Sequence, residues 1–149
     1  MKKFLFVGLV LVSLLFFLGC AQPVSDNFKV SYLVEDSLAK YTVLLIFNSN
    51  SSATLDLSLA DGNTFHSVSS LDSNELYEFK QLINSANVNS LSDVYECTSS
   101  CNDKLSTTVT FFIDGKEKKV LIKDLKGLPL GLAMVINEIQ SLWGEKFSK

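Results

Sequence analysis

The sequence predicts an α+β fold with a mostly antiparallel sheet, in the order β-meander, helix, β-hairpin, helix, and with the two helices packed on one face. Three observations predict it. Apolar and polar residues alternate after Phe28, as in half-buried strands. After Asp72 the apolar residues recur every three or four positions, as in a helix. Asp114-Gly115 then marks a hairpin turn before a second helical pattern.

The opening meander contains four expected strands, over residues 28–35, 41–47, 54–59 and 64–68. Residues 41–47 differ from the others because apolar side chains occupy both faces, which favours a central strand covered on both sides, or partly so. Asn48 to Ser52 and Asp61-Gly62-Asn63 supply the turn residues.

Asp72 and Glu75 have the spacing of a capping box, which predicts that the first helix begins there. Its apolar stripe consists of Leu76, Phe79, Leu82, Ile83 and Ala86. A loop is expected from Val88 to Leu105, and a loop of this length is usually functional or tied down. The side chains that would tie it by packing inward are Leu91, Val94 and Tyr95.

The hairpin strands are expected over residues 107–113 and 116–122, with Val109, Phe111 and Ile113 on one face. The last helix is expected to begin at Pro129 and to end near Gly144. Its apolar stripe consists of Leu132, Val135, Ile136, Ile139, Leu142 and Trp143.

The first residues indicate export. Lys2 and Lys3 precede an uncharged apolar run that is short for a permanent membrane span, the pattern of a secretory signal. The run ends in Phe17-Leu18-Gly19-Cys20, which resembles the lipobox of prokaryotic membrane lipoproteins. That resemblance implies a diacylglycerol on the Cys20 thiol and cleavage before it. The alternative is an uncleaved membrane helix with an incidental cysteine.

The chain therefore divides into a signal peptide over residues 1–19, a lipidated tether over residues 20–27 and a single domain over residues 28–147. We expect the domain to lie outside the cytoplasm, on the cell surface or the periplasmic side, with the membrane as a partner through the lipid.

The charge balance argues against a nucleic-acid partner. Removing two of the 13 basic residues leaves 11 against 16 acidic ones, and arginine does not occur. Phosphate backbones are bound by clustered Lys and Arg. Five lysines do gather between residues 116 and 126, where a solvated strand face is expected and contact with anionic lipid is the alternative.

Cys97 and Cys101 remain if Cys20 is lipidated, and an even remainder in an exported chain predicts a disulfide between them. The bond would close a very small loop and pin a local turn. A zinc site would need about four ligands. A redox motif would normally place two residues between the thiols, where this chain has three.

The remaining candidates for chemistry are few. His66 is the only histidine, and an outward-facing strand residue is the simpler interpretation of it. Asp93, Glu96 and Asp103 surround the cysteine loop; they are candidates for a calcium site, although solvated charges are expected. Asn50-Ser51-Ser52 fits the N-glycosylation pattern in an exposed turn. No catalytic residue, cofactor or metal is assigned.

The layout also resembles a loosely defined family of uncharacterised prokaryotic envelope domains, through Tyr95, Asp103, the hairpin over residues 107–119 and Leu128-Pro129. This resemblance brings no chemistry with it. We expect a non-catalytic binding or accessory module that docks on another envelope protein or captures a ligand. An uncovered apolar patch would support this, and the opposite face of residues 41–47 is where it is expected. The alternatives are an envelope hydrolase and a thiol–disulfide protein using Cys97 and Cys101.

Overall fold

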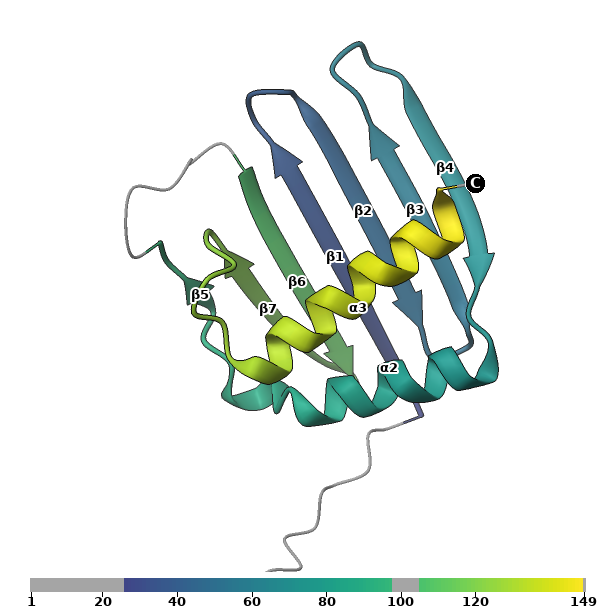
Figure 1. Cartoon of the computed structure of the whole chain (residues 1–149), viewed down its shortest axis with the longest axis vertical. Coiled ribbons are helices and arrows are strands. Elements are labelled where there is room, and N and C mark those ends of the chain that lie inside the picture. The colour runs from purple at the N-terminus through teal and green to yellow at the C-terminus, as the bar shows by residue number, and fades with distance from the viewer. Residues whose placement is uncertain (1–25, 98–104, 149) are drawn as a thin grey trace, which may run out of the picture.

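The computed structural model describes residues 26–97 and 105–148. Figure 1 shows one twisted sheet with two helices in front of it, so the predicted α+β class is confirmed. The strands are β1 (Phe28–Asp36), β2 (Tyr41–Asn48), β3 (Ser52–Ser58), β4 (Thr64–Ser70), β5 (Val94–Tyr95), β6 (Leu105–Ile113) and β7 (Lys116–Ile122). The helices are α2 (Ser73–Ser85), a 3-10 turn η1 (Val88–Ser90) and α3 (Leu130–Phe147).

The strand order across the sheet is β4-β3-β2-β1-β6-β7-β5, which the sequence left open. Every neighbouring pair is antiparallel except β5 with β7, which is parallel. The meander therefore forms one half of the sheet and the hairpin forms the other, with β1 joining them. The Asp114-Gly115 turn has φ values of 53° and 75°, as a tight hairpin turn requires.

Helix α2 starts as the sequence predicts. The Asp72 carboxylate accepts hydrogen bonds from the backbone N–H groups of Asn74 and Glu75 at 2.8 and 2.9 Å. The Glu75 carboxylate in turn accepts the Asp72 N–H at 2.6 Å, which completes the capping box. The pKa of Asp72 is lowered because these backbone donors, that of Glu75 first, stabilise the ionised form.

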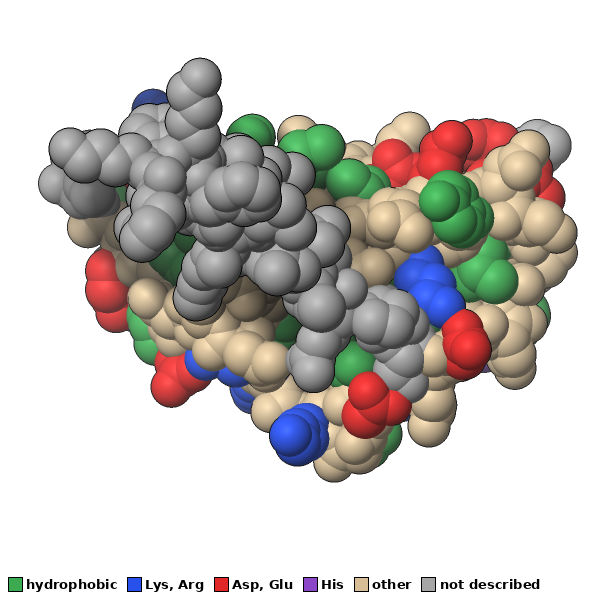
Figure 2. Space-filling view, turned by 90° about the horizontal axis from the view of Figure 1, so that it is seen from below, with side chains coloured by type: hydrophobic (Ala, Val, Ile, Leu, Met, Phe, Trp, Pro, Cys, Tyr) green, Lys and Arg blue, Asp and Glu red, His purple; other side chains and the backbone are tan. Residues whose placement is uncertain are grey.

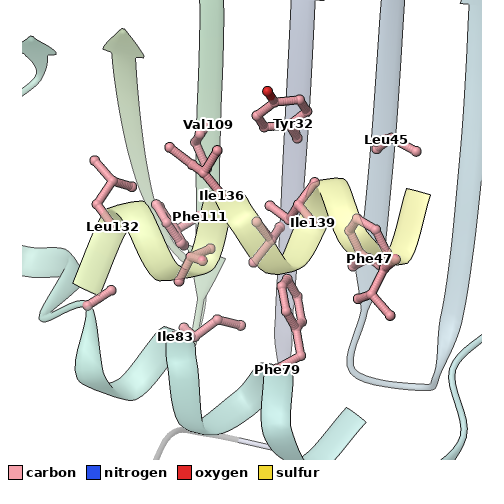
Figure 3. Packing of buried hydrophobic residues seen from close by; sticks show 14 of the residues in the cluster. Tyr32, Leu45, Phe47, Phe79, Ile83, Val109, Phe111, Leu132, Ile136 and Ile139 are labelled. Carbon is pink, nitrogen blue, oxygen red and sulfur yellow. The ribbon is translucent and has the colours of Figure 1, made fainter. Parts of the chain in front are cut away.

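The core lies between the sheet and the two helices (Figure 3). Phe79 of α2 is fully buried, and its ring centroid lies 5.3 Å from that of Phe47 and 6.2 Å from that of Phe28. Ile136 and Ile139 project from α3 toward the same layer. The predicted stripes of both helices are thus the faces that pack on the sheet. Trp143 is only partly buried against the core.

Two expectations were wrong in detail. The last helix continues to Phe147 rather than ending near Gly144, because Phe147 packs against the core and Lys146 bonds to Glu75 of α2. Residues 41–47 form an inner strand that is covered in part, as predicted: one face is buried, and Leu44 and Ile46 of β2 are half-buried on the other. The expected 88–105 loop contains η1 and β5, and Val94 is exposed whereas Leu91 is buried.

No helix in the described part of the chain is long and apolar enough to cross a membrane.

Candidate interaction face

The face of the sheet opposite the helices is the largest feature that the fold leaves without a cover from the described residues (Figure 1). Residues paired directly across antiparallel strands share a face, so the register identifies its members. Leu33 pairs with both Leu44 and Thr108, and Thr108 pairs with Leu121. In the next row Ser31 lies between Ile46 and Thr110. We call this surface the open face.

The centre of the open face, on β2, β1 and β6, is uncharged. Its apolar members are Leu33, Leu44 and Ile46, and its hydroxyl members are Ser31, Thr42, Thr108 and Thr110. Asp56 of β3 lies beside Leu44 and Lys119 of β7 lies beside Thr110, so a charged residue borders this centre on each side. Three strands at about 4.8 Å spacing and four residue steps of about 3.4 Å give the centre an area of roughly 200 Å².

Charged residues surround the open face at its corners. Lys29 and Glu117 lie at one end of the strands and Glu35 at the other. On the β3–β4 side the His66 ring is hydrogen-bonded to Asp56, with Nδ1 and Oδ1 2.6 Å apart. Half-exposed leucines inside a charged rim form the pattern expected of a protein-binding surface.

His66 therefore faces outward on a strand, as the simpler interpretation predicts. Its side chain is 62% exposed, and Asp56 is its hydrogen-bond partner within the described residues. An Asp–His pair orients an imidazole, but nucleophilic catalysis also needs a hydroxyl or thiol within reach of the ring. Within the described residues the hydrogen bond of the ring is to the Asp56 carboxylate and not to a hydroxyl or thiol. The pair belongs to the rim of the open face.

The cysteine loop begins on a tied strand. β5 is held on β7 by hydrogen bonds from the Leu121 N–H to the Asp93 carbonyl at 2.8 Å and from the Lys123 N–H to the Tyr95 carbonyl at 3.0 Å. Sequence analysis missed this strand because two residues are too few to show a period. Cys97 follows β5 directly, whereas Cys101 lies outside the described residues, so the disulfide stays a prediction.

Two of the three carboxylates considered as calcium ligands lie in the described residues, and each is paired with a lysine. Asp93 bonds to Lys118, and Glu96 lies 3.0 Å from the Lys123 ammonium. An ammonium at that position neutralises the oxygens that a calcium ion would need. Asp103, like Cys20, lies outside the described residues. Lys118 and Lys123 are thus partners of acidic side chains, which the expectation of a solvated lysine face did not include.

Asn50 lies in the exposed turn between β2 and β3, as predicted, and its side-chain oxygen accepts the Ser52 N–H at 3.1 Å. Whether a glycan is attached stays a prediction.

A second charged cluster joins the two helices on the opposite side of the molecule. Lys146 of α3 bonds to Glu75 of α2 at 2.5 Å, and this hydrogen bond is the main reason that the pKa of Lys146 is raised. The pKa of Glu138 is also raised, first by burial and then by repulsion from Glu78, Glu75 and Glu145. The Lys146–Glu75 pair thus links α3 to α2, whereas Glu138 is repelled by the carboxylates around it.

At the end of the sheet where β1 begins, acidic and basic side chains lie next to each other (Figure 2). One such pair is Asp26 with Lys80 of α2, and their hydrogen bond lowers the pKa of Asp26. This contact fixes the direction in which the chain enters the domain from its N-terminal side.

A shallow hollow of about 440 Å³ lies beside the β1–β2 turn, lined by Glu35, Asp36, Ser37, Lys40, Tyr41, Thr42 and Ser106. Its lining mixes both charges, and it opens widely to solvent. The open face is therefore the candidate functional site.

Comparison with known proteins adds no family. The chain matches no protein-family model, and a search of curated proteins returns no match.

Proposed function

We propose that the chain is a lipid-anchored, extracytoplasmic envelope protein whose domain is a non-catalytic binding or accessory module. The observation that carries the proposal is the open face: an uncharged centre of leucines, isoleucine and hydroxyl residues, left without a helix, on an otherwise well-packed sheet. A sheet face that only contacts solvent usually carries polar residues at its outward positions, because apolar and polar residues alternate along each strand.

The chemistry of the face indicates the class of partner. Branched apolar and threonine side chains on the open side of a sheet present a surface suited to another folded protein. A small ligand would instead need a concave pocket that buries most of its surface. At roughly 200 Å² the uncharged centre is much smaller than the approximately 800 Å² per partner of a standard interface, so the charged residues around it must supply much of the contact.

The proposed location of the domain depends on the sequence of its N-terminal segment. The lipobox-like run ending at Cys20 supports an anchor on the outer side of a membrane, and residues 21–27 supply a polar tether. Lipid anchoring keeps the domain near other envelope proteins and raises their effective concentration, so a modest docking face is sufficient for association.

The experiment is crosslinking of the chain in its native envelope, with partners identified by mass spectrometry. The Leu44→Asp variant places a charge at the centre of the open face, and Cys20→Ser removes the anchor. We expect one recurrent partner that is lost in both variants. A partner that persists in Leu44→Asp would show that docking uses another surface, and a complete lack of partners would refute the accessory function.

A matched control keeps the Leu44→Asp result interpretable. Tyr77 is a large, exposed residue of α2, 63% exposed, on the helix side of the molecule. Tyr77→Asp adds the same charge away from the open face and should leave the partner bound.

A further inference from the structure

Strand β4 forms one edge of the sheet and pairs only with β3 among the described strands. The opposite edge is the two-residue β5, which is short and carries the Asp93–Lys118 contact beside it. In Figure 1 no described element lies beyond β4. β5 covers only Leu121 and Ile122 of β7, and the rest of that outer edge carries three lysines, which protect it. The seven-residue strand β4 is therefore the long open edge without such charges among the described strands.

The hydrogen bonds at both ends of β4 show which of its backbone groups are unpaired. The Leu59 N–H donates to the Asn63 carbonyl at 2.9 Å, and the Leu71 N–H donates to the Ser51 carbonyl at 2.8 Å. Antiparallel ladders alternate between bonded and non-bonded pairs. The odd-numbered residues of β4 therefore bond to β3, and the outward N–H and C=O groups belong to Thr64, His66, Val68 and Ser70.

Natural proteins protect long edges with lysine, proline, inward-pointing charges or bulges. The β4 sequence, Thr-Phe-His-Ser-Val-Ser-Ser, contains no lysine, proline or carboxylate. Its register with β3 continues without a bulge from Thr64 to Ser70. The strand also exposes two apolar side chains, Phe65 at 55% and Val68 at 63%. An edge of this kind is a template for another strand.

We propose that β4 pairs antiparallel with β4 of a second copy of this chain, about a two-fold axis through Ser67, so that two sheets join into one. In this register Thr64 lies opposite Ser70, and His66 lies opposite Val68, of the second copy. These are the residues with outward backbone groups, so each of the four donates one bond and accepts another. All of the outward groups along the strand then find partners, which gives eight hydrogen bonds across the two-fold axis.

The side chains of the edge fit this register. On the helix side Phe65 lies over Ser69 of the second copy, and on the other side Val68 lies against His66. The contact therefore covers part of Phe65 and of Val68 in both copies. His66 is the one ionisable residue of β4, and it lies opposite Val68 of the second copy, so no like charges face each other across the axis. An isologous contact of this type closes at two copies and does not propagate.

The two-fold axis runs normal to the sheet, so both open faces lie on the same side of the joined sheet. The same axis places the two β1 starts at opposite ends. Both starts are equally distant from a membrane that lies parallel to the sheet, so in that orientation a tether from residue 20 to residue 28, which reaches about 25 Å when extended, allows both copies to be anchored in one membrane. The inference does not depend on the proposed function, since it rests on β4 alone.

The test introduces a cysteine on the two-fold axis. In the proposed register Ser67 lies directly opposite Ser67 of the second copy. The two form a non-hydrogen-bonded pair, in which the Cα atoms are about 4.5 Å apart, within the range of a disulfide. Ser69 lies on the same face of the same strand, but the Cα atoms of Ser69 in the two copies would be about 14 Å apart. The full chain carrying Ser67→Cys or Ser69→Cys is purified in mild detergent and treated with a mild oxidant.

We expect a disulfide-linked dimer for Ser67→Cys and only the background of the parent chain, with its own three cysteines, for Ser69→Cys. Equal crosslinking at both positions, or none above background for Ser67→Cys, would overturn the proposal. A Ser67→Cys chain linked only to a different protein would also overturn it, and would identify β4 as the edge for a foreign strand.

A second variant removes the dimer without an added thiol. The Val68 N–H points outward, so Val68→Pro deletes an edge donor and leaves the bonds to β3 intact. Analytical ultracentrifugation should show a concentration-dependent dimer for the parent and for the control Val68→Ala, and a monomer for Val68→Pro. The circular dichroism spectrum should be unchanged. A parent that stays monomeric at every concentration would contradict the inference.

Discussion

The contact between α2 and α3 depends on one glycine. A Cβ at Gly131 would lie 2.6 Å from the Ala86 Cα and 2.8 Å from the Ser85 carbonyl oxygen, both backbone atoms at the end of α2. Ordinary carbon–carbon contacts are about 3.5–4.0 Å, so Gly131→Ala forces the helices apart by roughly 1 Å. At Gly144, also in α3, a Cβ would meet nothing within 4 Å. The two glycines form a matched pair.

The two alanine variants should change stability in opposite directions. Overpacking costs about 1–3 kcal/mol. The gain in helix propensity is at most about 1 kcal/mol and is smaller at the second residue of a helix. We expect Gly131→Ala to lower the free energy of unfolding by about 1–2 kcal/mol, or roughly 3–10 °C in Tm. Gly144→Ala should raise the free energy of unfolding by about 0.5–1 kcal/mol, because a helical glycine loses more backbone entropy on folding than alanine does.

The assay is urea unfolding followed by the fluorescence of Trp143, the single tryptophan, which is partly buried against the core. Thermal unfolding by circular dichroism gives an independent value. If Gly131→Ala stabilises the chain as Gly144→Ala does, the two helices do not cross at this distance, and the packing described here is wrong.

Three further variants probe the core and the charges. Phe79→Ala should cost about 3–5 kcal/mol in urea unfolding, because it empties a fully buried site between two rings; a loss below about 1 kcal/mol would contradict that packing. The pKa of Glu138 is raised in the fold, so its ionisation destabilises the protein as pH rises through that pKa. Glu138→Gln should therefore raise the free energy of unfolding at pH 7 by less than about 0.5 kcal/mol after screening, and Tm with it. The gain should disappear at pH 4, and a gain independent of pH would exclude the electrostatic cause. The pKa of Asp72 is lowered, so its contribution is present above the ordinary pKa and is lost as pH falls through the lowered one. Asp72→Asn keeps a capping oxygen but loses the charge, so it should lower the free energy of unfolding at pH 7, approach the parent at low pH and flatten the acid side of the stability profile; an unchanged acid slope would refute the role of the carboxylate.

The sequence alone predicted the strands and helices in which a regular apolar periodicity extends over many residues. The alternation that begins at Phe28 and the stripe through Phe79 and Ile83 correspond to buried faces in the structure, because burial on one side imposes those periods. The capping box at Asp72 and the turn at Asp114-Gly115 were predictable because each depends on side-chain chemistry or a positive φ.

The strand order and β5 were not predictable, because they depend on contacts between residues distant in the sequence. Val94 lies next to Leu121 in the sheet. The end of α3 was misjudged for a similar reason, since the Lys146–Glu75 ion pair and Phe147 carry the helix past Gly144. A glycine ends a helix only where tertiary contacts do not continue it.

The open face could be located from sequence only in part. Apolar residues on both sides of β2 indicated that an outward apolar surface was possible, but the same pattern also fits a strand covered twice. The register decided between them, because it places Leu33, Leu44 and Leu121 in one row that no described helix covers.

The central claim is that the open face docks a partner protein. The most direct measurement places a photo-crosslinking amino acid at position 44, at the centre of the open face, and at position 77 on α2 as the control, each in the anchored chain in its native envelope. The account predicts a single crosslinked partner band from position 44 that is absent from position 77. The same band from both positions, or none from position 44 while the chain remains folded and anchored, would contradict it.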